Sequence, residues 1–242
     1  MRSLLLLALV ACGSKAEGPT QGERVRTAIL DVNSHVFVLK KDNFAGYREV
    51  LATVAGADSQ IVAAGPMLFV EANLITKKAG SPILLKGLSA NHTLLRSDLA
   101  RYVTAGSIDT KVTGAMPIAI GSTLAQNLAL SIGDRVEVDV IERMDKPPRG
   151  TAQIVAIFRT EFPEYDSVLA LTQLEAVQAL LGKGDVAMGI ELKLRDFTQA
   201  TRVAKDLGNK LGPDYKVVDW CELNRAFLHC EDSTSPALAE YK

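Results

Sequence analysis

Gly189-Ile190-Glu191-Leu192-Lys193-Leu194 alternates apolar and charged residues, and this period of two predicts a half-buried β-strand. Asp196 follows as a helix cap. The next apolar side chains share one stripe at helical spacing: Phe197, Ala200, Val203, Ala204, Leu207 and Leu211. Residues 215–220 then predict a second strand, so this part of the chain forms a β-α-β unit.

An earlier stretch has the same order of elements. Residues 36–40 predict a strand, and Asp42 and Asn43 are candidate helix caps. The helix that follows carries its apolar side chains at helical spacing: Phe44, Tyr47, Val50, Leu51 and Val54. Residues 61–70 return as extended chain, with Pro66 marking a bend or an edge. Two such units can share one sheet in the split β-α-β arrangement, with both helices on one face.

The segment between the two β-α-β units has another pattern of predicted strands and helices. Its alternating and apolar runs predict further strands, and its periodic runs predict helices: strands at 82–88, 116–121, 135–142 and 153–159, helices at 94–102 and 122–130. The predicted fold class is α+β, in which two β-α-β units form a mixed sheet and a smaller α+β insert interrupts them. The predicted division is a signal peptide (1–11), a flexible tether (12–27), a sheet subdomain (28–80 and 153–230), an insert (81–152) and a polar tail (231–242).

Composition excludes two classes of function. The chain of 242 residues carries 27 Lys and Arg against 28 Asp and Glu, so it has no excess of positive charge to neutralise a phosphate backbone, and we expect no nucleic-acid partner. Beyond the first dozen residues, the longest uncharged apolar run is 61–70. A membrane-spanning helix needs about 20 residues, so we expect no internal span.

The N-terminus has the layout of a secretory signal. Arg2 precedes a short apolar run, residues 4–11, which covers less than half of a bilayer. Leu9-Val10-Ala11-Cys12 resembles a bacterial lipobox, which implies cleavage before Cys12 and lipid attachment to it. The mature domain would then lie on the periplasmic side of a membrane, and Gly13 favours the outer membrane. The alternatives are a plain signal that ends at Cys12 and a truncated transmembrane helix.

The remaining cysteines and histidines do not indicate a metal site or a catalytic site. Cys221 and Cys230 would point to opposite sides of an unbroken helix, so they are either two separate thiols or a disulfide that requires the helix to end early. The three histidines are scattered without metal-ligand spacing, and there is no phosphate-binding loop or nucleophile elbow. We therefore expect no metal, no cofactor and no enzyme activity.

Five stretches resemble the periplasmic domain of the lipoprotein-releasing ABC permeases of the LolC/LolE type, which are related to MacB-like periplasmic core domains. They occur in the order of that family: Ile29-Leu30 with Ser34-His35-Val36; Ile120-Gly121 with Leu124-Ala125 and Leu128; Gly133-Asp134; Ile157-Phe158 with Glu164-Tyr165-Asp166; and Asp219-Trp220 with Asn224. The resemblance implies a porter subdomain interrupted by a sabre subdomain. It also implies a role in lipoprotein transport with a separate ATPase, other permease subunits, a LolA-type carrier and lipidated cargo proteins.

In that family a protruding hairpin, the hook, recruits the carrier. The matching connection here is 144–150, and the resemblance places Lys146, Pro147, Pro148 and Arg149 at its tip as partner-binding residues. The bland alternative is a plain solvated turn, and the hairpin is short for a hook. Proline would stiffen the loop and reduce the ordering cost of docking.

Three classes of function follow. The first is a non-catalytic extracytoplasmic domain of lipoprotein-releasing permease type that binds protein or lipidated cargo. The second is a free-standing, membrane-anchored lipoprotein scaffold that docks another transporter or envelope complex. The third, a hydrolase using Glu161, Glu164 and Asp166, is the weakest, because carboxylates in a loop are usually solvated.

Overall fold

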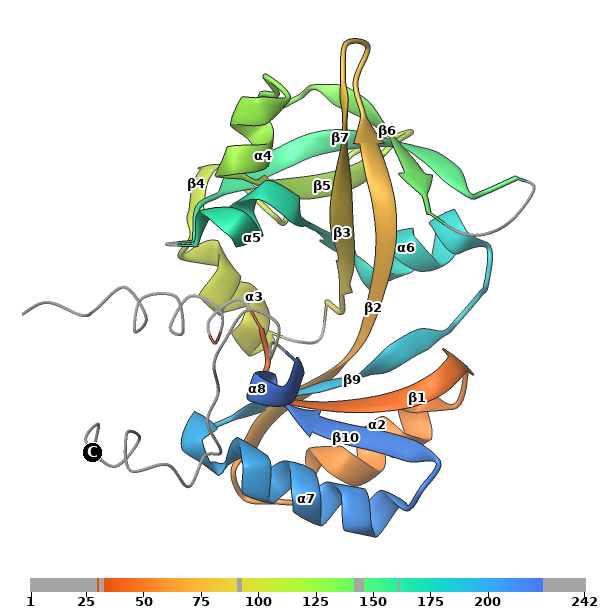
Figure 1. Ribbon diagram of the computed structural model, residues 1–242, viewed down its shortest axis with the longest axis vertical. Helices are drawn as coiled ribbons and strands as arrows, with labels where there is room; N and C mark the ends of the chain where they lie inside the picture. The colour runs from red at the N-terminus through yellow and green to blue at the C-terminus, as the bar shows by residue number, and fades with distance from the viewer. Residues whose placement is uncertain (1–29, 31–32, 91–92, 142–145, 161, 224–242) are drawn as a thin grey trace, which may run out of the picture.

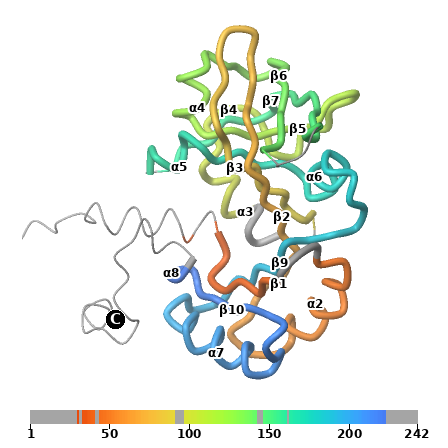
Figure 2. Tube along the Cα trace, turned by 45° about the vertical axis from the view of Figure 1, so that its right-hand side comes forward, coloured from red at the N-terminus to blue at the C-terminus, as the bar shows by residue number. Residues whose placement is uncertain are grey.

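The computed structural model describes residues 30, 33–90, 93–141, 146–160 and 162–223. One sheet runs through the molecule in the order β10-β1-β9-β2-β3-β8-β5-β7-β4, and β6 pairs with β2 and β7. The elements gather in two lobes, and the long strand β2 (Ile61–Ile75) passes from one lobe into the other (Figures 1 and 2). The fold is therefore a mixed α+β architecture, as the sequence predicts.

The first lobe, called the open-sheet lobe, contains both β-α-β units. Its elements are β1 (Val36–Phe44), α2 (Tyr47–Ala55), the first part of β2, β9 (Ala187–Leu194), α7 (Ala200–Leu211) and β10 (Tyr215–Asp219). Strand β9 lies between β1 and β2 and is antiparallel to both, while β10 pairs with the other edge of β1. The two units thus interleave in one sheet, which confirms the split β-α-β prediction.

Both helices of the open-sheet lobe cover the same face of its sheet. Tyr47 and Val54 from α2 and Val203 and Leu207 from α7 belong to one buried cluster with side chains of β1 and β9. The short helices η1 (Phe197–Gln199), before α7, and α8 (Trp220–Leu223), after β10, meet each other, because the rings of Phe197 and Trp220 lie 6.2 Å apart. The apolar stripe predicted for this helix anchors α7 from Ala200 onward, whereas Phe197 lies in η1 and outside this cluster.

The predicted N-terminal cap of α2 is wrong. Asp42 and Asn43 lie inside β1, and α2 begins only at Tyr47, after Gly46, which offers no side-chain cap. The strand continues to Phe44 because that residue is needed in the sheet core, where it is 1% exposed. Asp196 does cap as predicted: its carboxylate accepts a hydrogen bond from the backbone N–H of Thr198 at 2.9 Å and starts η1.

The second lobe, called the ring lobe, is built from strands that close on themselves. Its strands are β3 (Gly80–Leu88), β4 (Val103–Gly106), β5 (Met116–Gly121), β6 (Arg135–Val140), β7 (Arg149–Phe158) and β8 (Leu169–Gln173), and its helices are α3 (Thr93–Ala100), α4 (Ser122–Asn127), α5 (Pro163–Val168) and α6 (Leu174–Leu181). Pairing runs from β2 to β3, β8, β5, β7, β6 and back to β2. This ring encloses a core of its own.

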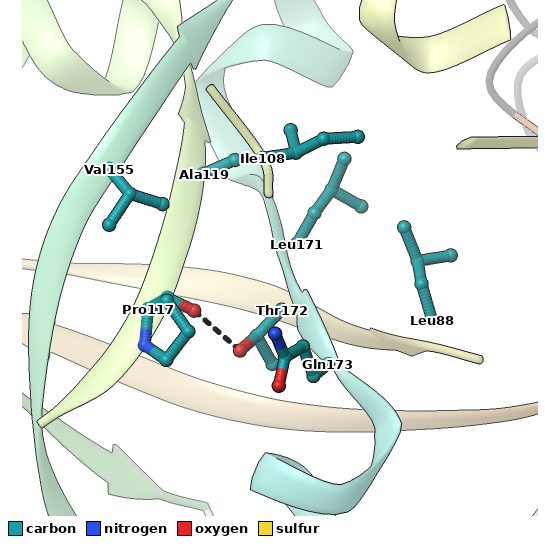
Figure 3. Close-up of a pocket in the computed structure, with 8 residues that line it drawn as sticks. All are labelled: Leu88, Ile108, Pro117, Ala119, Val155, Leu171, Thr172 and Gln173. Atoms are coloured by element: carbon teal, nitrogen blue, oxygen red, sulfur yellow. Dashed lines mark hydrogen bonds between the residues drawn. The ribbon is translucent and has the colours of Figure 1, made fainter. Parts of the chain in front are cut away.

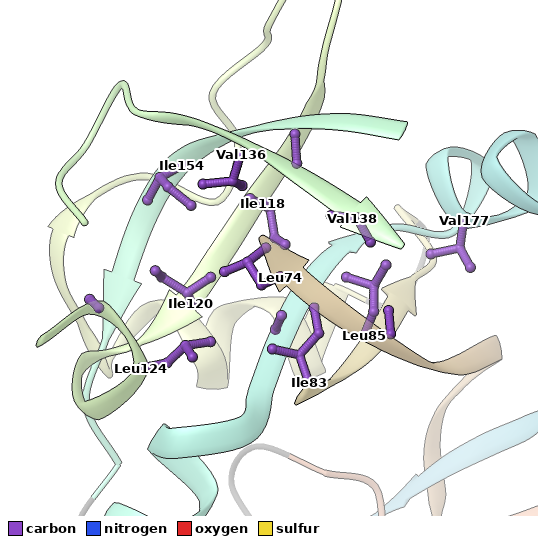
Figure 4. Packing of buried hydrophobic residues seen from close by; sticks show 14 of the residues in the cluster. Leu74, Ile83, Leu85, Ile118, Ile120, Leu124, Val136, Val138, Ile154 and Val177 are labelled. Carbon is purple, nitrogen blue, oxygen red and sulfur yellow. The ribbon is translucent and has the colours of Figure 1, made fainter. Parts of the chain in front are cut away.

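The core of the ring lobe is aliphatic. Its side chains come from every strand of the ring and from α4 and α6, and they converge in the interior: Leu74, Ile83, Leu85, Ile118, Ile120, Leu124, Val136, Val138, Ile154 and Val177 (Figure 4). Strand β6 packs one face on this core, because Val136, Val138 and Val140 are buried and the residues between them are not. The division of the chain into 28–80 with 153–230 and 81–152 stays a prediction, since one sheet joins these parts.

Strand β9 differs from its prediction. Its alternating pattern predicts one solvated face, yet Glu191 is 0% exposed and Lys193 is 8% exposed. The ring lobe and the residues before β1 cover that face, and both charged groups find partners there. The polar face of β9 is therefore part of the junction between the lobes.

Candidate functional site

The predicted partner-binding residues lie together at the connection between β6 and β7. Lys146 and Pro147 are exposed, and Pro148 is half-buried. The hairpin closes where the N–H of Val140 donates to the carbonyl of Pro148 at 2.9 Å. Arg149 is the first residue of β7 rather than part of the loop, and residues 142–145 lie outside the described residues.

Charge and apolar surface meet at the base of this hairpin. The Arg149 guanidinium, whose side chain is 67% exposed, donates to Oδ2 of Asp139 at 2.5 Å. Oδ1 of Asp139 is buried and has no hydrogen-bond partner among the described residues. Ile141, next to it, is 49% exposed, and its N–H donates to the carbonyl of Glu71 in β2. The hairpin thus presents cations and proline beside an exposed aliphatic side chain.

A polar cluster at the junction of the lobes was not found from the sequence. Lys86 of β3 and Glu191 of β9 form an ion pair at 2.8 Å, and both side chains are 0% exposed. Lys86 Nζ also lies 3.5 Å from Oδ1 of Asn33 and 5.2 Å from the ring centre of Phe69. Asn33 in turn donates to the Tyr165 hydroxyl at 2.7 Å. The only signal in the sequence is the charge of Lys86 within an apolar strand, which is equally typical of a strand edge.

A second lysine of β9 extends this cluster. Lys193 Nζ donates to the carbonyl of Leu30 at 2.8 Å and pairs with Asp98 of α3 at 2.9 Å. His35 lies beside them, and its Nδ1 accepts a hydrogen bond from the N–H of Leu194 at 3.1 Å. Burial, and then the positive charge of Lys193, lower the pKa of His35 from 6.5 to about 4. His35 is therefore a neutral acceptor at neutral pH.

The two described members of the acidic group considered for a hydrolase lie in different surroundings. Glu161 lies outside the described residues, Glu164 is exposed and Asp166 is 2% exposed. Asp166 accepts hydrogen bonds from the backbone N–H of Thr160 and from the hydroxyls of Thr160 and Ser122. Burial raises the pKa of its carboxyl above the ordinary value, against those hydrogen bonds. Asp166 fixes the turn before α5.

Gly121, which belongs to the Ile120-Gly121 motif of the resemblance, has a steric role. A Cβ at this position would lie 2.2 Å from the carbonyl oxygen of Asp166, a distance that real Cβ atoms essentially never show. Only glycine allows the start of α4 to pass this close to α5. Ile120-Gly121 and Tyr165-Asp166 are thus two sides of one contact in the ring lobe.

Two hollows are found in the described surface. A small cavity beside β5 and β8 is lined mainly by apolar side chains, and its polar contact is internal, because the Thr172 hydroxyl donates to the carbonyl of Pro117 at 2.6 Å (Figure 3). An open polar hollow lies at Ser122, Gln126, Arg159 and Asp166. Among the described residues, no group of three or more His, Cys, Asp or Glu side chains could hold a metal ion.

The predicted lipid-attachment residue, Cys12, lies outside the described residues. Cys221 is described and is disulfide-bonded, so it is not the separate thiol that was one of the two expectations. The helices of the described part include none that is both long and apolar enough to span a bilayer.

Comparison with known proteins finds relatives that are named lipoprotein-releasing system transmembrane proteins. The chain is similar to the protein named lipoprotein-releasing system transmembrane protein LolC from Xylella fastidiosa, with 28% identity over 208 residues. LolC of Neisseria meningitidis serogroup B is 23% identical over 214 residues. These matches confirm the resemblance to the lipoprotein-releasing permeases. No family model matches the chain.

The similarity covers different shares of the two proteins. It takes in 84% of this chain but 50% of the LolC protein of Xylella fastidiosa, so the chain spans about half the length of the curated relatives it matches. Two solved structures are also similar. The periplasmic region of MacB from Actinobacillus actinomycetemcomitans has a TM-score of 0.49 and 11% identity, covering 84% of this chain and 97% of that one. The extracellular domain of the transporter YknZ has a TM-score of 0.48 and 13% identity, covering 76% and 98%.

Proposed function

We propose that this chain is a non-catalytic extracytoplasmic domain of lipoprotein-releasing permease type, which takes part in lipoprotein export by binding protein or lipidated cargo. The observation that carries the proposal is the similarity to LolC over most of the chain. Burial of Asp166 also supports a non-catalytic role, because this carboxylate already holds a turn. The domain would lie on the periplasmic side of a membrane, with permease and ATPase subunits as partners.

The β6–β7 hairpin is the proposed partner-binding element. Lys146, Pro147, Pro148 and Arg149 give it positive charge and a stiff, partly apolar surface, and Ile141 adds an aliphatic contact. A partner that fits would offer carboxylates around an apolar patch, and a LolA-type carrier is the candidate that the resemblance suggests. Proline reduces the conformational entropy that the loop loses on docking.

Site-specific photocrosslinking in the intact cell tests this proposal. A photoreactive amino acid replaces Pro147, and a matched one replaces Lys205, which is exposed on α7 of the open-sheet lobe. We expect a carrier of the LolA type, or permease and ATPase subunits, to be captured from position 147 and not from 205. Lys146→Glu should reduce the capture, and Lys205→Glu should leave it unchanged. Capture of unrelated envelope proteins alone would support the scaffold function instead.

The scaffold alternative rests on Leu9-Val10-Ala11-Cys12, which resembles a lipobox. In that function the chain is a free-standing lipoprotein that docks another transporter or envelope complex, and Cys12 is its lipid attachment, with Gly13 favouring the outer membrane. The sequence contains three cysteines, so a lipid on the Cys12 sulfur leaves Cys230 as the partner of Cys221.

The cysteine count makes lipid attachment testable. Mass spectrometry of peptides from a digest of the unreduced protein should find an acylated N-terminal Cys12 and a linked pair of peptides that contain Cys221 and Cys230. Cys12→Ser should move the protein from the membrane fraction to the soluble fraction, since two or more acyl chains anchor firmly. A disulfide between Cys12 and Cys221 would exclude lipid on that sulfur.

A further inference from the structure

The sheet that joins the lobes is narrow where it passes from one lobe to the other along β2. Strand β2 pairs with β9 through Met67 and with β3 from Met67 onward, so the two ladders overlap at a single residue. Pro66, directly before it, has no N–H to add to either ladder. Bending of β2 near Met67 would therefore change the angle between the lobes while disturbing few backbone hydrogen bonds.

The buried ion pair spans this narrow point. Glu191 is opposite Gly65 on one side of β2, and Lys86 is opposite Phe69 on the other side. Positions 65 and 69 share a face of the strand, so the two side chains meet above β2 at 2.8 Å. Bending of β2 would pull Lys86 and Glu191 apart, and the relative position of the lobes depends on their contact.

The residues that precede β1 are held by the same groups. Lys193 Nζ lies 3.3 Å from the carbonyl of Asn33, and Lys86 Nζ lies 3.5 Å from its side-chain oxygen. The N–H of His35 donates to the carbonyl of Leu192, and the carbonyl of His35 accepts from the N–H of Trp220. Residues 33–35, here called the leading segment, thus contact both lobes and the start of α8.

A charge pair is an unusual choice for a permanently closed contact. Apolar side chains of similar volume give equal or greater stability in such a place, and removal of one charge leaves the other buried and unpaired. Oε1 of Glu191 also has no hydrogen-bond partner among the described residues, so the pair is not fully satisfied when closed. Charged groups become well hydrated when a contact opens, whereas apolar groups resist exposure.

We propose that Lys86, Glu191, Lys193 and Asp98 form an opening lock between the lobes, and that the leading segment is the piece whose displacement releases it. In the closed state, which is the structure described here, the two ion pairs hold β3 and α3 against β9. In the open state β2 bends near Met67, both pairs are hydrated and the leading segment leaves the junction. The inference does not depend on the proposed partner or on lipid attachment.

Distance measurements by pulsed electron spin resonance on the full chain test the lock. Spin labels on noncanonical amino acids replace Asn127, exposed on α4 of the ring lobe, and Asn209, exposed on α7 of the open-sheet lobe. Glu191→Gln keeps the shape of the side chain but removes its charge. We expect this variant to add a second distance population, and the double variant Lys86→Met with Glu191→Met to show one narrow population.

Two further variants keep the test decisive. Asp98→Asn breaks the outer pair, and also the pair with Arg101, at a side chain that is 24% exposed. We expect it to fold even where Glu191→Gln does not and to broaden the distribution to a smaller extent. Arg202→Gln removes pairs with Asp58 and Asp206 within the open-sheet lobe and should leave the distribution unchanged. An unchanged distribution in both Asp98→Asn and every folded Glu191→Gln sample would overturn the proposal.

Amide hydrogen exchange gives an independent reading of the leading segment. The N–H groups of His35 and Trp220 are bonded within this segment's contacts, so their exchange should accelerate together in Glu191→Gln. Amides in the middle of α7 serve as the reference, because their hydrogen bonds stay within one helix. Equal acceleration in α7 would mean general loss of stability and would contradict a local lock.

Discussion

Acidification tests the environment of His35 directly. His35 is 6% exposed, and the pKa of its imidazole is lowered from 6.5 to about 4 in the folded chain, first by burial and then by the charge of Lys193. Between these two pKa values the unfolded chain binds a proton that the folded chain refuses. The free energy of unfolding must therefore fall as the pH falls from about 6.5 to about 4.

The size of the effect follows from the two pKa values. For this single group, the free energy of unfolding should decrease by about 2.5 kcal/mol between about pH 7.5 and about pH 4.5. Carboxylates titrate in the same range, so the contribution of His35 has to be isolated by a variant. His35→Asn keeps an acceptor that can reach the N–H of Leu194 and removes the titrating ring.

Urea unfolding at a series of pH values supplies the measurement. The unaltered chain should lose about 2.5 kcal/mol more than His35→Asn over this interval. Phe197→Leu is the control, because it removes the ring that meets His35 edge-on at 6.2 Å but leaves the titrating group. The difference in the free energy of unfolding between Phe197→Leu and the unaltered chain should be nearly the same at each pH.

If the free energies of unfolding of the unaltered chain and of His35→Asn change with pH in parallel, the pKa of His35 is not lowered by folding. Proton-detected NMR of the ring gives a second check, because the carbon-bound ring proton reports the protonation state of the folded chain. A midpoint near 6.5 would show that His35 is solvated and that the junction between the lobes is open in solution.

Three further changes test the packing by denaturant unfolding. Lys86→Met leaves Glu191 buried and unpaired and should reduce the free energy of unfolding by about 3–5 kcal/mol. The double variant with Glu191→Met should restore most of this loss, and equal losses in the single and double variants would contradict the expectation. Gly121→Ala should cost about 1–3 kcal/mol or more, because its Cβ would collide with the Asp166 backbone, and a neutral result would show that this contact relaxes. Leu74→Ala opens a cavity in the ring core and should cost about 2–5 kcal/mol, whereas a loss below about 1 kcal/mol would mean that the ring collapses around it.

Local patterns were sufficient to predict the open-sheet lobe. The helical stripe of α7 and the strand at residues 215–219 are determined by their own sequence, because each buries one face against a single layer. The interleaving of the two units also follows from their repeated order, since the split arrangement is the compact way to pair them. The start of α2 could not be predicted, because Asp42 and Asn43 resemble caps whether or not the strand continues through them.

The ring lobe could be predicted only in part. Strands β5, β6 and β7 show clear apolar or alternating runs, but β8 and α6 follow one another directly, so no loop residues in the sequence mark the boundary between them. Closure depends on β8 lying parallel to β3 and on β6 returning to β2. Such pairing between distant segments is not encoded in any local window, because each strand would fit several neighbours equally well.

The polar junction was the hardest feature to predict, because the burial of a charge depends on a partner far away in the sequence. Lys86 and Glu191 each resemble a residue on a solvated strand face until their strands are placed on either side of β2. The motifs shared with the permeases also acquire a physical explanation at this junction. His35 and Trp220 are joined there by a backbone hydrogen bond, and Tyr165 reaches the junction through Asn33. Three of the five stretches that carry the resemblance thus have a residue at the contact between the lobes, whereas Gly121 and Gly133 make their contacts within the ring lobe.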